Sequence, residues 1–287
     1  MFEGYPGSGE LVMQMRPALH PLFTKLPDGI SEFTFSDLYL FRNTHKYLIS
    51  KLTNDLFVIT GQDKYGPFFM LPLGLPAEKL LDELFLKFQS IKAVSLTQSM
   101  ALSIMGYMVV GDRDNFDYLY PRKELAELLG RDMHKKRNRL NAFTRKYDCQ
   151  TKPLLDEYIN DALEVLYLWR QERDDDGDYE AAKEAIRYMN ELQLCGAIYY
   201  VEGKAVGFTL GEELAVGTSF AIHFEKAVNV EQYKGLYQYI NQTFAAMLPE
   251  KYETVNREQD LGEEGLRRAK ESYNPQGFVK KYRATKL

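Results

Sequence analysis

The chain has 287 residues, 45% of them hydrophobic and 13% aromatic, so it is long enough for two domains with packed cores and is not a disordered protein. Its formal charge of −5 argues against a surface that is basic throughout, although a local basic patch is compatible with it. The two cysteines, Cys149 and Cys195, have no partners at metal-ligand spacing and indicate a reducing compartment. The sequence has no signal peptide and no long apolar run, so we expect a cytoplasmic protein without a membrane span or a metal site.

The first half of the chain predicts a helix, a hairpin, a second helix and short strands. Residues 31–48 carry aromatic residues at near-helical spacing behind a capping serine. Apolar runs at 56–60 and 68–72, separated by a turn that contains two glycines, indicate the hairpin. Residues 76–89 follow as an amphipathic helix, and residues 93–96 and 116–120 as strands.

The second half repeats this order of elements. Helices are expected at 156–173 and 179–192, and the clearest hairpin of the chain at 196–201 and 205–210. A strand at 218–224, a helix ending near Met247, a C-terminal strand and a helix at 265–272 complete the half. The repetition predicts domains at 1–132 and 148–287, joined by a helix at 133–147.

The connecting helix is strongly basic. Six Lys and Arg side chains and no acidic one lie between Met133 and Tyr147. A solvated linker helix is one interpretation. The other is a surface that contacts the phosphates of RNA, a cofactor or a lipid headgroup. The candidate contacts for the second interpretation are Lys135, Lys136, Arg137 and Arg139.

The C-terminal segment carries the most specific pattern. A polar run, NREQD, begins at Asn256 and leads into a short helix that ends at Tyr273. A strand end rich in carboxylates that feeds a helix is a typical place for a site in an α/β fold. A solvated loop before a C-terminal helix is the simpler alternative.

These elements carry a resemblance. The order of hairpin, strand, glycine-containing turn, helix, strand and helix, ending in Ala269-x-x-x-Tyr273-x-x-x-Gly277-Phe278, resembles the GNAT fold of N-acetyltransferases. Two such halves joined by a basic helix, with the motif NREQDLGxxGLRxAKxSYxP, resemble the C-terminal domain of bacterial phosphatidylglycerol lysyltransferases and the related Fem aminoacyltransferases. The resemblance covers the chain from about Phe33 and implies a mixed α/β protein of two tandem GNAT-like domains.

For chemistry, the resemblance implies transfer of an acyl or aminoacyl group from a CoA thioester or an aminoacyl-tRNA to an amine or hydroxyl. Tyr273 is the implied acid for the leaving group, and Glu258 and Asp260 are candidates for the base or for orienting the amine. The expected substrate-binding residues are Asn256, His223, Lys226, Arg267 and Lys270.

The implied phosphate turn is Gln232, Lys234 and Gly235, but Tyr237 stands where the acetyltransferase pattern has a glycine, which argues against ordinary CoA binding. No further cofactor is expected. The acceptor stays open between a small molecule, a lipid headgroup and a peptide, and a homodimer is compatible with the sequence. The rival hypothesis is an inactive GNAT-like protein that binds a ligand or partner.

Overall fold

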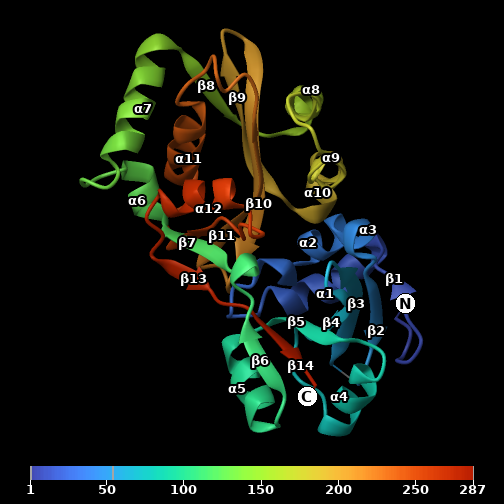
Figure 1. The fold of residues 1–287 in the computed structure, drawn as a ribbon. Helices are drawn as coiled ribbons and strands as arrows, with labels where there is room; N and C mark the ends of the chain where they lie inside the picture. Colours follow the sequence, from blue (N-terminus) through green and yellow to red (C-terminus); the bar gives the residue numbers. More distant parts are fainter. Residues whose placement is uncertain (1, 54, 287) are drawn as a thin grey trace. The chain divides into compact units, whose positions relative to one another are not determined.

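The computed structural model describes residues 2–53 and 55–286, which form two compact units, each with a seven-stranded mixed sheet (Figure 1). Unit 1 comprises Met1–Asp117, Gln259–Glu264 and Phe278–Leu287, and unit 2 comprises Tyr118–Glu258 and Gly265–Gly277. These bounds differ from the division expected at 132 and 148, because residues 118–147 pack in unit 2 and the end of the chain packs in unit 1.

Unit 1 is built on a sheet of the order β1-β2-β3-β4-β5-β14-β6. The expected hairpin is present as β3 and β4, and β5 runs parallel to β4. Leu84 of α4 and Leu102 of α5 pack with Phe69 of β4 in a fully buried core. The strands are Gly9–Glu10 (β1), Leu48–Lys51 (β2), Phe57–Asp63 (β3), Gly66–Met70 (β4), Ser90–Val94 (β5), Met108–Gly111 (β6) and Tyr282–Thr285 (β14), and the helices are Arg16–Phe23 (α1), Phe35–Leu40 (α2), Arg42–His45 (α3), Glu78–Phe85 (α4) and Leu96–Ile104 (α5).

Two parts of unit 1 differ from the expectation. The helix expected at 31–48 is a 3-10 turn followed by α2 and α3, because Thr34 has an extended backbone and caps α2 by accepting a hydrogen bond from the Asp37 amide at 3.0 Å. Helix α5 and strand β6 were not expected. Ser95 and Gln98 form a capping box that starts α5.

Unit 2 has a sheet of the order β13-β7-β12-β11-β10-β9-β8. Its central hairpin, β9 and β10, confirms the prediction, and the basic connecting helix is present as α7. The strands are Asp117–Pro121 (β7), Cys149–Pro153 (β8), Cys195–Val201 (β9), Lys204–Leu214 (β10), Ser219–Ala227 (β11), Thr254–Asn256 (β12) and Gly277–Val279 (β13), and the helices are Arg122–Glu127 (α6), His134–Lys146 (α7), Ile159–Gln171 (α8), Tyr179–Arg187 (α9), Met189–Leu192 (α10), Leu236–Met247 (α11) and Glu264–Glu271 (α12).

Each sheet contains a strand from the other half of the chain. Strand β14, at the C-terminal end, lies between β5 and β6 and pairs antiparallel with both (Figure 1). Strand β7, from the first half, lies between β12 and β13. The two halves have therefore exchanged one strand each, and neither sheet is complete without residues from both halves.

The two units also share a local backbone pattern. In unit 1, β4 and β5 pair in parallel at two positions, and then come Lys92 and Ala93, whose φ is +53°. In unit 2, β11 and β12 pair in parallel at three positions, and then come Arg257 and Glu258, whose φ is +56°. Both non-glycine residues adopt the left-handed conformation at the same point, just after a basic residue. This correspondence supports a tandem origin. None of the helices in the described chain is long and apolar enough to cross a membrane.

Candidate functional site

The candidate site lies where β11 and β12 stop pairing. Their parallel register joins Ser219 to Thr254, Phe220 to Val255 and Ala221 to Asn256. Beyond this point β11 continues to Ala227, whereas the chain leaves β12 after Asn256. The edge of β11 from residue 222 onward is thus not paired with β12, and polar side chains lie at this divergence.

An ion pair spans the divergence. Arg257 Nη2 lies 3.1 Å from Glu225 Oε2, and both side chains are largely buried. Asn241 of α11 donates to the other oxygen of Glu225 at 2.8 Å. Burial opposes the charge of the guanidinium, but Glu225 and the nearby tyrosines Tyr120, Tyr273 and Tyr237 together outweigh it and raise the pKa of Arg257. The pair is therefore charged and held in a fixed position.

Tyr273 lies beside this ion pair, directly after α12. The ring is buried, and the centroid is 5.5 Å from Cζ of Arg257 and 4.1 Å from Nζ of Lys136. Burial raises the pKa of Tyr273 to about 12, against the opposing effects of Arg257 and Gln238. Among the described residues, none makes a hydrogen bond of regular geometry to its hydroxyl. Tyr273 is thus a protonated, buried donor with no fixed acceptor.

Lys136 links the basic helix α7 to this cluster. Its ammonium donates to Ser272 Oγ at 2.5 Å and lies over the ring of Tyr273. Burial, followed by the nearby charges of Arg139 and Arg257, lowers the pKa of Lys136 to about 8. A fraction of this amine is therefore neutral near physiological pH, unlike that of an exposed lysine.

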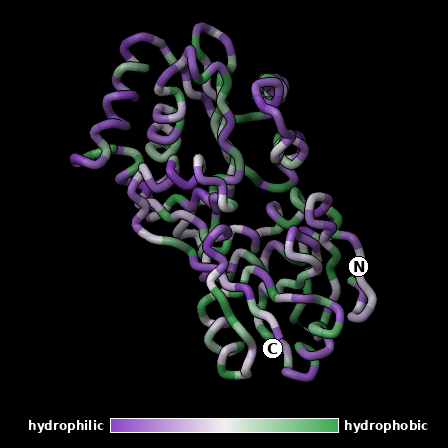
Figure 2. The backbone as a smooth tube through the Cα atoms, in the orientation of Figure 1, coloured by the Kyte–Doolittle hydropathy of each residue, from purple (hydrophilic) through white to green (hydrophobic). Residues whose placement is uncertain are grey.

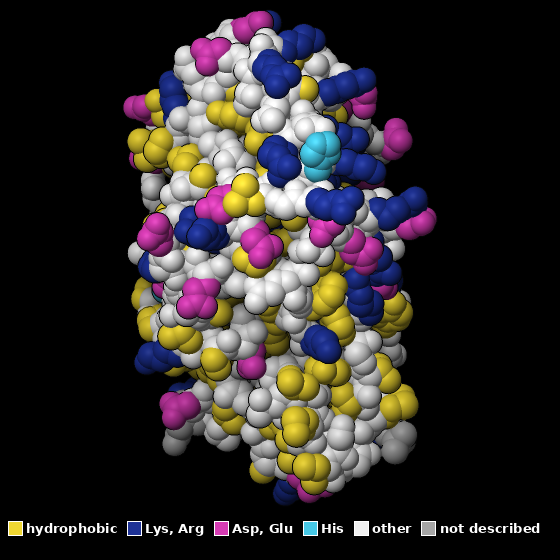
Figure 3. Space-filling model, turned by 90° about the vertical axis from the view of Figure 1, so that its left-hand side faces the viewer, with side chains coloured by type: hydrophobic (Ala, Val, Ile, Leu, Met, Phe, Trp, Pro, Cys, Tyr) yellow, Lys and Arg dark blue, Asp and Glu magenta, His cyan; other side chains and the backbone are white. Residues whose placement is uncertain are grey.

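The other predicted contacts of α7 separate into two groups. Lys135 and Arg139 are exposed. Figure 3 shows Lys and Arg side chains gathered over the upper part of the face that it draws. Arg137 instead donates to the backbone carbonyls of Leu128 and Gly130, which fixes the start of the helix. Two of the four predicted contacts are thus open to a polyanion, Lys136 is half-buried, and Arg137 has a structural role.

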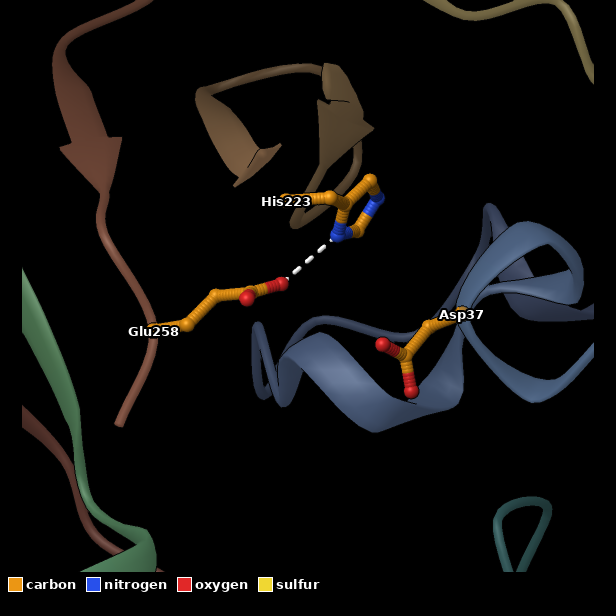
Figure 4. A group of neighbouring side chains, drawn as sticks. All are labelled: Asp37, His223 and Glu258. Atoms are coloured by element: carbon orange, nitrogen blue, oxygen red, sulfur yellow. Dashed lines mark hydrogen bonds and ion pairs between the residues drawn. The ribbon is translucent and has the colours of Figure 1, made fainter. Parts of the chain in front are cut away.

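The other face of β11 carries a second charged group. His223 is the extra residue of a β-bulge, since Leu210 pairs with Phe224 and Gly211 with Ile222. Its Nδ1 lies 2.6 Å from Glu258 Oε1 (Figure 4) and its Nε2 lies 3.0 Å from Glu212 Oε1. Burial lowers the pKa of His223, but the two carboxylates outweigh it and raise the pKa well above its usual value. His223 is therefore an imidazolium that holds the carboxylate of Glu258.

Lys226 is also fixed by an ion pair. Its ammonium binds both oxygens of Asp178, at 2.6 and 2.7 Å, and lies 4.1 Å from the ring centroid of Trp169. Burial lowers the pKa of Lys226, and Asp178 opposes this effect. Because Glu225 binds Asn241 of α11 and the next residue binds Asp178, the two adjacent side chains lie on opposite faces of the sheet.

Two further predicted residues, Asn256 and Lys270, have structural contacts. Asn256 is fully buried and accepts a hydrogen bond from the Glu258 amide at 2.8 Å. The ammonium of Lys270 donates to the carbonyls of Arg257 and Glu258, so it holds the chain that follows β12. Arg267 lies half-buried on α12.

Asp260 belongs to unit 1, whereas Glu258 and Tyr273 belong to unit 2. It is fully buried, lies 3.0 Å from Nη1 of Arg113, and accepts a hydrogen bond from the Gly262 amide. These contacts give Asp260 a structural role in unit 1.

The predicted phosphate turn packs against α7. Gly235, with φ of +106°, starts α11, and a Cβ there would lie 2.5 Å from the carbonyl oxygen of Arg139 and 2.8 Å from Cβ of Phe143. Tyr147 donates to the carbonyl of Gln232 at 3.0 Å. Helix α7 thus occupies one side of the turn that binds pyrophosphate in the acetyltransferase pattern. Lys234 is exposed.

Sequence reasoning missed Glu225 and Asn241. Glu225 lies near the end of a strand, where a charged residue usually faces solvent, and Asn241 lies on a helix in a mixed polar and apolar pattern. The one feature of the sequence that could have identified Glu225 as a site residue is the position of its carboxylate within the largely apolar strand β11.

A comparison with protein families identifies the chain. Residues 23–285 match the family model described as "Phosphatidylglycerol lysyltransferase, C-terminal". The chain belongs to this family. A curated relative, an uncharacterised protein of Mycoplasmoides gallisepticum, is 27% identical over 176 residues, which are 58% of this chain and 54% of the relative. The chain thus spans about half the length of the curated relative that it matches.

Solved structures of other proteins have the same fold. A conserved protein of unknown function from Bacteroides thetaiotaomicron has a TM-score of 0.86 and 28% identity, over 98% of this chain and 99% of that one. A tandem GNAT protein from the clavulanic acid biosynthesis pathway has a TM-score of 0.51 and 8% identity, over 97% of this chain and 95% of that one. The second likeness shows the fold alone: two tandem GNAT-like units of mixed α/β architecture, as the sequence predicted.

Proposed function

We propose that the protein is a transferase that moves an acyl or aminoacyl group from an activated donor to an amine or hydroxyl, with its reaction centre at the divergence of β11 and β12. The observation that supports this most directly is the hydroxyl of Tyr273, which is buried, protonated and without a fixed acceptor beside two cations. A buried donor left unpaired costs stability, and a ligand or a reaction that uses the hydroxyl explains why the cost is kept.

The reaction has three requirements, and the chain offers a group for each. The acceptor enters from the face of β11 that carries Glu258, attacks the carbonyl carbon of the donor across the open edge of that strand and transfers its proton to the carboxylate of Glu258, which His223 holds in place. Negative charge on the carbonyl oxygen is stabilised by Arg257 and Lys136. The bond to the leaving sulfur or ribose oxygen then breaks, and that atom takes the proton of Tyr273.

Between the two donors, we propose aminoacyl-tRNA. Helix α7 packs against the turn at Gly235, where the acetyltransferase pattern places the pyrophosphate of CoA. The exposed Lys135 and Arg139 on the same helix suit a donor with many phosphates. The family's name, which refers to a lysyltransferase, agrees with an aminoacyl donor.

Single-turnover transfer tests the proposal. The protein is mixed in excess with total tRNA charged with labelled amino acids, or with labelled acetyl-CoA, and hydroxylamine serves as a simple amine acceptor. We expect the protein to accelerate loss of label from tRNA and not from acetyl-CoA. Consumption of acetyl-CoA alone would reverse the choice of donor. If neither donor is consumed while charged tRNA still binds, the protein is a binding module and the transferase proposal fails.

A further inference from the structure

An apolar surface of unit 1 has no part in the proposed transfer. Residues 93–111 contain no charged side chain, although 27% of the whole sequence is charged. This segment forms α5 and β6. Its exposed apolar side chains, which we call the α5–β6 surface, are Leu96 (56% exposed), Met100 (61%), Ile104 (86%), Met108 (48%) and Val110 (50%).

Figures 2 and 3 show the same clustering of apolar residues. In Figure 2 the tube has the colours of hydrophobic or neutral residues along α5 and β6. Figure 3 shows hydrophobic side chains gathered over the lower part of the side that it draws. Leu96, Met100 and Ile104 follow one another at every fourth residue, so they form a single stripe along the helix. An exposed apolar surface of this extent is unusual on a monomer and normally marks an interaction site.

Strand β6 also has an open edge. It is the last strand of its sheet and pairs with β14 on one side, and the described part of the chain provides no strand on the other. Soluble proteins usually protect such an edge with a lysine, a proline, a bulge or a covering element. Residues 105–111, MGYMVVG, contain neither lysine nor proline. The outer edge therefore offers backbone donors and acceptors to another strand.

The apolar side chains lie on both faces of this edge. Helix α5 packs on β14 and β6, the last two strands at this edge of the sheet, and carries its stripe on that face. Val109 packs into the core on the same side, so the alternation of a strand directs Met108 and Val110 to the opposite face. A flat partner such as a bilayer would cover only one of these faces. A strand that brings its own helix would cover the stripe with that helix and lie directly beside Met108 and Val110.

We propose that β6 pairs antiparallel with β6 of a second copy of this chain, about a two-fold axis, and that α5 packs against α5 of that copy. A two-fold contact places the same segment on both sides, and an uncharged segment can face itself without repulsion between like charges. One operation thus pairs the open strand edge, covers the stripe of α5 and places Met108 and Val110 beside the same side chains of the second copy. The surface exposes on the order of several hundred Å² per copy, close to the ~800 Å² per partner of a standard interface.

The mass of the full chain in solution tests this proposal. By sedimentation velocity at concentrations from about 1 to about 100 µM, we expect the wild type to have twice the mass of the chain, with dissociation on dilution. Val110→Lys adds a charge at the strand edge and Ile104→Glu adds one on the helix stripe. We expect each to weaken the dimer at least ~100-fold. Circular dichroism and thermal unfolding verify that both variants are folded.

The matched control is Val216→Lys, at a 60% exposed valine in the connection between β10 and β11 of unit 2. This variant should dimerise like the wild type. A wild-type chain that stays monomeric over the whole range would overturn the proposal, and so would a control variant that dissociates as readily as Ile104→Glu. If the monomer instead co-sediments with phosphatidylcholine vesicles and Ile104→Glu abolishes this, the surface contacts lipid and not a second copy.

Discussion

Arg257 and Glu225 form a largely buried ion pair, with 3.1 Å between Nη2 and Oε2, at the point where two parallel strands stop pairing. In unit 1 the residue at the corresponding point is Lys92, which is also buried. Both units thus keep a cation where their parallel strands diverge. Unit 2 differs because it adds a buried tyrosine and a half-buried lysine around that cation.

The ion pair makes a prediction about stability. Glu225→Gln and Arg257→Met should each lower the free energy of unfolding by about 3–5 kcal/mol, because each leaves one charged group buried without its partner. The double variant should lose less than the sum of the two single losses. Urea unfolding of all four proteins gives the coupling energy, and additive losses would show that the two side chains do not interact.

His223 makes a prediction about pH. Its pKa is raised in the folded state, so its contribution is full below the unfolded pKa of about 6.5 and is lost as pH rises through the higher folded value. The stability advantage of the wild type over His223→Gln should therefore shrink between pH 6.5 and the folded pKa, by up to about 1.4 kcal/mol per pH unit. Urea unfolding at a series of pH values measures it. An advantage that grows with pH in this window would mean that His223 is neutral.

The exchanged strands make a prediction about fragments. A fragment of residues 1–132 lacks β14, which lies inside its sheet, and also lacks Lys281, which is fully buried against Asp117 at 2.6 Å. We expect this fragment to be unfolded or aggregated. Addition of a peptide of residues 278–287 should restore part of its structure, measured by circular dichroism. A scrambled peptide is the control, and a cooperatively folded fragment without the peptide would contradict the account.

The hairpins and the basic helix could be predicted from the sequence, because each rests on a pattern within one segment. The repetition of the two halves follows from the order of such segments along the chain. The exchange of β7 and β14 could not, since these strands are five and four residues long and pair with segments far away in the sequence. The site was predictable in part. Tyr273 follows from its motif, whereas Glu225 acquires its meaning only from Arg257, which lies 32 positions later in the chain.

Asp260 shows that residues close together in the sequence need not belong to the same site. It is only two positions from Glu258, but the boundary between the compact units falls between them. Its contacts with Arg113 and with the Gly262 amide depend on the fold of unit 1, which a polar run in the sequence does not reveal.

The role of Tyr273 as the acid for the leaving group is the central claim. Single-turnover transfer from charged tRNA should be slowed ~10²–10⁴-fold by Tyr273→Phe, while tRNA affinity stays close to wild type and the free energy of unfolding is equal to or higher than that of wild type, because the lost hydroxyl has no regular hydrogen bond in the described structure. Tyr167→Phe, at a tyrosine that is 55% exposed, is the matched control and should transfer at the wild-type rate. An unchanged transfer rate in Tyr273→Phe would contradict the account.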